Sequence, residues 1–117
     1  MKKRISENYL TKIPIRNPEI KWEANSHELI TLFIENRGVF NRLAQRFFKK
    51  PKTSQVHLDQ NGSYAWSLID GERDIIEIAR FVDERFGEEA HPLYKRLARF
   101  FQTLETHGFI SFKKIKR

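Results

Sequence analysis

Apolar residues recur at helical spacing in three successive segments of the second half of the chain, at residues 63–70, 74–87 and 92–108. Ser63 is the expected N-cap of the first segment, and Pro92 suits the first turn of the third. The spacing predicts three amphipathic helices. Their expected inner faces comprise Tyr64, Trp66, Leu68 and Ile69, then Ile75, Ile78, Ala79, Val82 and Phe86, and finally Leu93, Leu97, Phe100 and Leu104.

The corner between the first two helices has the residues of a helix-turn-helix. Gly71 stands where a helix end favours a left-handed residue, and Asp74 precedes Glu77 by three positions, as in a capping box. We interpret Asp70 as turn chemistry rather than as a catalytic carboxylate. Trp66 is expected to anchor the core, because so large an apolar side chain is costly to leave in water. We therefore expect the corner to stabilise the fold and not to bind a ligand.

The first half of the chain alternates polar and apolar residues instead. Residues 20–23 and 28–35 flank the turn-forming stretch ANSH and predict a β-hairpin, and residues 54–59 predict a third strand. Residues 1–18 lack periodicity and are expected to form an irregular N-terminal arm. Residues 39–50 predict a further amphipathic helix, whose stripe consists of Val39, Phe40, Leu43, Ala44, Phe47 and Phe48.

Together these elements predict a single α+β domain over residues 1–117. Its expected architecture is winged helix-turn-helix-like, with an N-terminal three-stranded antiparallel sheet followed by three helices. Residues 109–113 could add a short final strand. A chain of 117 residues that is 39% hydrophobic can bury one modest core.

Composition indicates the cellular compartment of the protein. The chain has no cysteine, so it has no disulfide framework. Its basic start is followed by no apolar run, which argues against a signal peptide. The apolar stretch Leu29–Ile34 is far too short to cross a bilayer. We therefore expect a soluble, cytoplasmic protein without a membrane association.

The net charge of +7 is unevenly distributed. Residues 1–57 hold 12 Lys and Arg against 5 Asp and Glu, whereas residues 58–112 hold 6 against 10, a net charge of −4. A protein that reads DNA should concentrate positive charge where it meets the phosphates. The charge pattern therefore argues against nucleic acid as a partner of the helical part.

A specific order of residues runs from the third expected strand through the three helices, namely Leu58, Gly62, Trp66, Ile69, Asp70, Gly71, Ile75, Ile78, Leu104, Glu105, Gly108 and Ile110. This order and its spacing, within residues 54–112, resemble the PqqD family. Asp74 departs from the threonine usual in that family, but both residues can cap a helix. The stretch before Ser54 is longer than the minimal family domain.

The resemblance implies a peptide-binding module without catalytic activity or a cofactor. PqqD-like domains hold the leader of a ribosomally made precursor peptide and present it to a modifying enzyme, often a radical S-adenosylmethionine protein. The resemblance places the leader as an added strand in a groove between the third strand and the third helix.

The residues that correspond to this groove follow from the resemblance. The strand edge would consist of Ser54, Gln55, Val56, His57 and Leu58. The helix side would use either Tyr94, Leu97 and Phe101, or Arg96 and Arg99. The sequence leaves the flank open. Leu97 also suits a core position, and the two arginines also suit a solvated face.

Other functions fit less well. The four histidines, at positions 27, 57, 91 and 107, lack metal-ligand spacing, and the glycines form no phosphate loop. The main alternative is a winged-helix DNA-binding protein, with Lys95, Arg96 and Arg99 on its recognition helix. A protein-interaction adaptor is a third interpretation. An exposed edge strand would also permit a homodimer.

Overall fold

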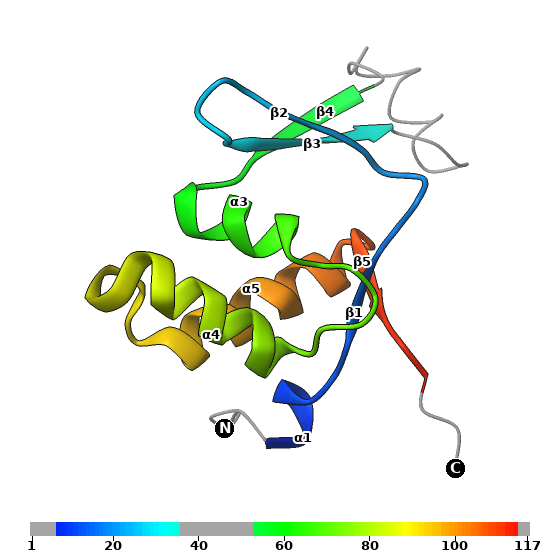
Figure 1. Cartoon of the computed structure of the whole chain (residues 1–117). Coiled ribbons are helices and arrows are strands. Elements are labelled where there is room, and N and C mark those ends of the chain that lie inside the picture. The colour runs from blue at the N-terminus through cyan, green and yellow to red at the C-terminus, as the bar shows by residue number, and fades with distance from the viewer. Residues whose placement is uncertain (1–6, 36–52, 115–117) are drawn as a thin grey trace, which may run out of the picture.

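The structure is a computed structural model, and it describes residues 7–35 and 53–114 (Figure 1). The helix predicted over residues 39–50 lies outside the described residues. In chain order the elements are α1 (Glu7–Leu10), β1 (Pro14–Arg16), β2 (Lys21–Ala24), β3 (Ile30–Glu35), β4 (Thr53–His57), α3 (Gln60–Ser67), α4 (Ile75–Phe86), the 3-10 helix η1 (Gly87–Ala90), α5 (Leu93–Thr106) and β5 (Ile110–Phe112).

The predicted hairpin and third strand form a three-stranded antiparallel sheet in the order β2-β3-β4. Trp22 lies opposite Leu32, and Leu32 lies opposite Val56. Leu32 is fully buried, because its face of the sheet covers α3, with α4 and α5 beyond it (Figure 1). The α+β class and this sheet are confirmed.

A second sheet corrects the expected arrangement. β1 pairs antiparallel with β5, and Pro14 lies opposite Phe112. The segment 1–18 is therefore not irregular where it is described, since it contains α1 and β1. The pairing continues on both sides, because Lys113 N donates to Ile13 O and Asn17 N donates to Phe109 O, at 2.8 and 2.9 Å. The strand predicted over residues 109–113 is confirmed as β5, whereas β1 is too short to leave a periodic pattern in the sequence.

The N-terminus of α3 also differs from the prediction. Asp59, not Ser63, is its N-cap, and Asp59 Oδ1 accepts a hydrogen bond from Gly62 N at 2.7 Å. Ser63 is buried in the first turn, where its Oγ accepts from Ile30 N at 2.8 Å and donates to Leu58 O at 3.3 Å. The serine therefore joins β3, the end of β4 and α3.

The corner after α3 is built in part as predicted. α3 ends at Ser67 with Leu68 as its C-cap, so Gly71 lies in the turn and not at the helix end. Gly71 has a φ of 79°, in the left-handed region that a residue without Cβ adopts at little cost. Asp70 Oδ1 accepts from the backbone N–H groups of Glu72 and Arg73, which lowers the pKa of Asp70. Asp74 caps α4 by accepting from Glu77 N at 2.9 Å. The corner thus turns the chain from α3 into α4 with its polar groups satisfied.

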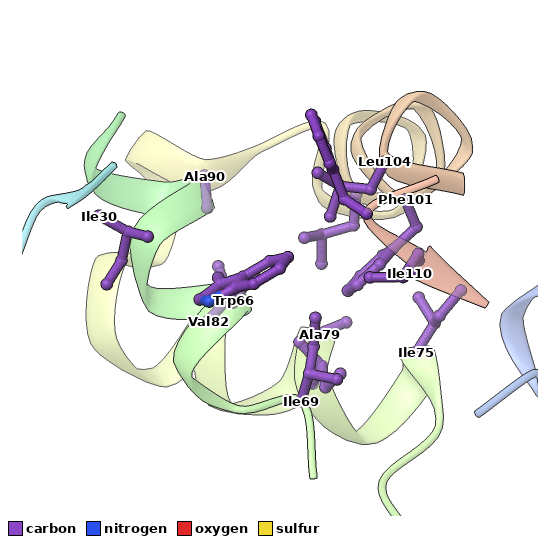
Figure 2. Close-up of a cluster of buried hydrophobic side chains, with 14 of the residues drawn as sticks. Ile30, Trp66, Ile69, Ile75, Ala79, Val82, Ala90, Phe101, Leu104 and Ile110 are labelled. Atoms are coloured by element: carbon purple, nitrogen blue, oxygen red, sulfur yellow. The ribbon is translucent and has the colours of Figure 1, made fainter. Parts of the chain in front are cut away.

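One hydrophobic cluster joins the helices to both sheets (Figure 2). Trp66 has no exposed surface and lies among Ala79 and Val82 of α4, Phe101 of α5 and Ile30 of β3. Its predicted role as a core anchor is confirmed.

Candidate functional site

The outer edge of β4 is open within the part of the chain that the structure describes, because β3 is its single neighbour. Leu58 N donates to Ile30 O at 2.9 Å, which fixes the phase of the ladder. Successive residues of an antiparallel strand point their backbone groups to alternate sides. Leu58 and Val56 therefore bond toward β3, whereas the N–H and C=O groups of Gln55 and His57 point outward. β4 can receive an added strand at those two residues.

The side chains of β4 alternate in the same way. Gln55 and His57 are exposed on the outer face of the sheet. Val56 and Leu58 are half-buried and pack against the hydrophobic core. Ser54 is paired with β3 in the register of the ladder. A strand added to β4 would therefore place every second side chain on the apolar side of the sheet.

The residues predicted on α5 have contrasting environments. Leu97 and Phe101 are buried in the core, at 5% and 0% exposure. Tyr94 is 45% exposed. Arg96 and Arg99 are also exposed, and Arg96 Nη1 donates to Glu89 O at 2.8 Å. The three exposed side chains are the accessible members of this set.

One flank of α5 faces the start of α3. Phe100 is half-buried there, and a Cβ added to Gly62 would lie 3.0 Å from Phe100 Cε1. Arg96 precedes Phe100 by four residues, so both lie on the same side of the helix. Phe100 therefore packs on the start of α3, the helix that follows β4.

The opposite flank of α5 faces α1. Burial, together with the negative charge of Glu105, raises the pKa of Tyr9 in α1 to about 12. Glu105 follows Phe101 by four residues and therefore shares its side of α5. Tyr94 belongs to that side as well, since it precedes Phe101 by two helical turns. Arg96 and Phe100 thus lie on one side of α5 and Tyr94 on another, and which side faces the strand edge stays a prediction.

Phe100 is not among the site residues expected from the sequence, although it lies on the same side of α5 as Arg96. Its position four residues after Arg96 was a usable signal, but helical periodicity alone placed Phe100 on the inner face. Its contact with Gly62 depends on how α5 crosses α3, which the sequence does not specify.

A separate hollow of about 270 Å³ lies beneath the turn of the β2-β3 hairpin. Trp22, Tyr64 and Phe86 supply aromatic walls. The guanidinium of Arg85 lies 4.7 Å from the centre of the Tyr64 ring, and Arg85 Nη2 lies 3.8 Å from Glu28 Oε2. The lining contains no residue of β4, so this hollow is distinct from the strand edge.

The described residues contain no group of three or more His, Asp or Glu side chains arranged to hold a metal ion. His91 Nε2 lies 2.8 Å from Asp83 Oδ1 as an exposed pair. Over residues 7–35 and 53–114, no helix has both the length and the apolar character needed to cross a membrane.

Comparison with known proteins gives a family assignment. The model of the family "Coenzyme PQQ synthesis protein D (PqqD)" matches residues 49–110. The matched region contains β4, α3, α4 and α5, and therefore both sides of the site described above. No curated protein and no solved structure matches the chain significantly. Since the family model covers just over half of the 117 residues, the chain belongs to the PqqD family.

Proposed function

We propose that this protein binds the leader segment of a ribosomally made precursor peptide as an additional strand on β4. It then presents the peptide to a modifying enzyme, such as a radical S-adenosylmethionine protein. In this role the chain is a cytoplasmic binding module of winged-helix type and performs no chemistry of its own.

The observation that carries the proposal is the open edge of β4. The outward N–H and C=O groups of Gln55 and His57 supply the hydrogen bonds that strand addition requires. Backbone pairing gives affinity for any extended peptide, so selectivity must come from neighbouring side chains. In the β4 groove, defined as this edge together with Arg96 and Phe100, those neighbours differ in character.

The β4 groove suits a peptide with alternating chemistry. Val56 and Phe100 are half-buried apolar side chains, and both offer surface that a ligand can cover. Arg96 and Arg99 are exposed and positively charged. We therefore expect the leader to combine apolar residues at every second position with acidic residues near the helix.

A titration with short peptides encoded by neighbouring open reading frames tests the proposal. Backbone amide signals of residues 53–58 and of α5 should shift together when the correct leader is added. Shifts confined to the hollow beneath the hairpin would instead assign the binding there. The absence of shifts for every neighbouring peptide would contradict the proposal.

A pair of proline substitutions isolates the backbone contribution. Gln55→Pro removes an outward N–H that β3 does not use, and edge strands tolerate such a proline. We expect this substitution to weaken peptide binding roughly tenfold or more, since it also blocks the close approach of a partner strand. Ala24→Pro places the same change on the opposite edge of the sheet and should leave the affinity unaltered.

A pair of arginine substitutions isolates the charge. Arg96→Ala should weaken binding of a leader with acidic residues, and the loss should shrink at high salt. Arg85→Ala removes an exposed arginine from the separate hollow and serves as the matched control. Equal effects of both substitutions would show that the affinity depends on net charge and not on the β4 groove.

Presentation to an enzyme needs its own measurement. The rate of peptide modification by a neighbouring radical S-adenosylmethionine enzyme should rise when the protein is added. Gln55→Pro should abolish that increase, while Ala24→Pro should preserve it. A DNA-binding role would instead give salt-dependent binding to random duplex DNA, which we do not expect from a helical region with net negative charge.

A further inference from the structure

The sheet has a second open edge within the described residues, at β2. All four residues of β2 are exposed, and β3 is its single neighbour. Trp22 packs against Trp66 on the inner face of the sheet and keeps 40% of its surface exposed. A bare edge that carries a large aromatic side chain favours a partner strand.

The phase of the β2-β3 ladder identifies the groups that such a strand would meet. Asn25 N donates to Leu29 O at 3.0 Å, so Asn25, Glu23 and Lys21 bond toward β3. The N–H and C=O groups of Trp22 and Ala24 therefore point outward. The side chains of Lys21 and Glu23 lie together on the face of the sheet away from the core, because they alternate with Trp22.

We propose that β2 pairs with β2 of a second copy of this chain, in antiparallel fashion and around a two-fold axis at Trp22. This inference concerns an edge that the proposed peptide binding does not use. In this register Trp22 of one chain lies opposite Trp22 of the other, and Lys21 of each chain lies opposite Glu23 of the other. The pairing joins two sheets of three strands into a continuous sheet.

The charges of Lys21 and Glu23 favour this register over the two registers in which Trp22 lies opposite Ala24 or Ile20. Trp22 and Ala24 must both take part, because they carry the outward backbone groups. Pairing Trp22 with Ala24 of the other copy would place Glu23 opposite Glu23. Pairing Trp22 with Ile20 would place Lys21 opposite Lys21. Like charges directly opposite one another destabilise a sheet, whereas Lys21 opposite Glu23 stabilises it.

The resulting interface is small and self-limiting. Ala24 lies opposite Ile20 of the other copy in this register, and Ile20 N already donates to Asn17 O at 3.0 Å. The pairing therefore makes few hydrogen bonds, and we expect a weak dimer at the lower end of specific interfaces. The two-fold symmetric pairing uses the β2 edge of both copies, so no third copy can pair at β2 and the assembly stops at two. Both β4 edges stay open, and the dimer presents two peptide-binding edges at opposite ends of one sheet.

A charge swap tests the register. Sedimentation equilibrium over about 1 µM to 1 mM protein, a range suited to a small interface, gives the dissociation constant. Lys21→Glu and Glu23→Lys should each weaken dimerisation roughly tenfold, because each creates two like-charge pairs. The double variant Lys21→Glu/Glu23→Lys should restore the original constant. Lys95→Glu, an equal change in net charge on α5, is the control and should have little effect.

The remaining outcomes overturn the inference. It fails if the unmodified chain stays monomeric to the highest concentration, if Lys95→Glu acts like Lys21→Glu, or if the double variant does not recover. Ala24→Pro should abolish the dimer and spare peptide binding, while Gln55→Pro should do the reverse. Failure of the dimer and failure of the proposed function are therefore distinguishable.

Discussion

The guanidinium group of Arg16 donates two hydrogen bonds to the carbonyl oxygen of Ile69, from Nε at 3.1 Å and from Nη2 at 2.6 Å. The same group lies 5.1 Å from the ring centre of Trp22 and 5.8 Å from that of Trp66. Burial lowers the pKa of Arg16. One side chain thus links the N-terminal arm to the hairpin and to the end of α3.

Arg16→Ala should lower the free energy of unfolding by about 2 kcal/mol, because a hydrogen bond from a charged donor contributes roughly 1.5–3 kcal/mol. Urea denaturation followed by circular dichroism measures the loss. Arg80→Ala, an exposed arginine on α4, is the control and should change stability by less than about 0.5 kcal/mol. Equal effects would mean that Arg16 acts through net charge alone.

Ser63→Ala should cost about 2 kcal/mol, because the N–H of buried Ile30 would lose its hydrogen-bond partner. Ser67→Ala is a matched control on the same helix, since Ser67 is exposed and should contribute little. Thermal unfolding distinguishes the two. A Ser63 variant as stable as the Ser67 variant would contradict a structural role for the buried hydroxyl.

Gly62→Ala should destabilise the fold by about 1 kcal/mol or more, because the added Cβ would meet Phe100 and Asp59 at 3.0 Å. In a helix without such contacts, Gly→Ala would instead stabilise by up to about 1 kcal/mol. The background variant Phe100→Ala removes the aromatic obstacle. In that background Gly62→Ala should cost less, although Asp59 Oδ1 still lies 3.0 Å from the added Cβ, and a double-mutant cycle measures the difference. An unchanged cost would contradict close packing of Phe100 on Gly62.

The pH dependence of stability should report on Asp70. Backbone hydrogen bonds from Arg73 and Glu72 lower its pKa in the folded state below the unfolded value. Its contribution is therefore complete above the unfolded pKa of about 4 and is lost as the pH falls through the folded value. Asp70→Asn should flatten the stability profile below about pH 4, as measured by urea midpoints. An identical profile in the variant would exclude this contribution.

The left-handed Gly71 and the cap at Asp74 were predictable from sequence, because each residue type has a specific local backbone role. The end of α3 was not, since the helix stops at Ser67 and Gly71 lies in the turn beyond it. Nor was the N-cap of α3. Ser63 and Asp59 are both suitable caps by residue type. Asp59 is the cap because the Ser63 hydroxyl instead accepts a hydrogen bond from the Ile30 N–H of β3. Similarly, β1 is too short to leave a pattern, and it forms because it pairs with β5 from a distant part of the chain.

The candidate site was likewise only partly predictable from the sequence. Alternation and the family resemblance predicted the strand edge at Gln55 and His57. Which backbone groups of β4 point outward follows from the β3-β4 pairing, whose phase is fixed by the hydrogen bond from Leu58 N to Ile30 O. On α5, composition suggested two flanks. Phe100 packs against Gly62 on one of them, and packing between helices is not encoded in the periodicity of either one.

The pairing of β1 with β5 has a practical consequence for engineering. Because Pro14 lies opposite Phe112, a short linker could join these two positions, and new termini could be opened elsewhere. Such a circular permutant should fold and keep its β4 edge accessible. The start of β1 and the end of β5 thus lie side by side, in a sheet other than the one that contains the strand that we propose receives the peptide.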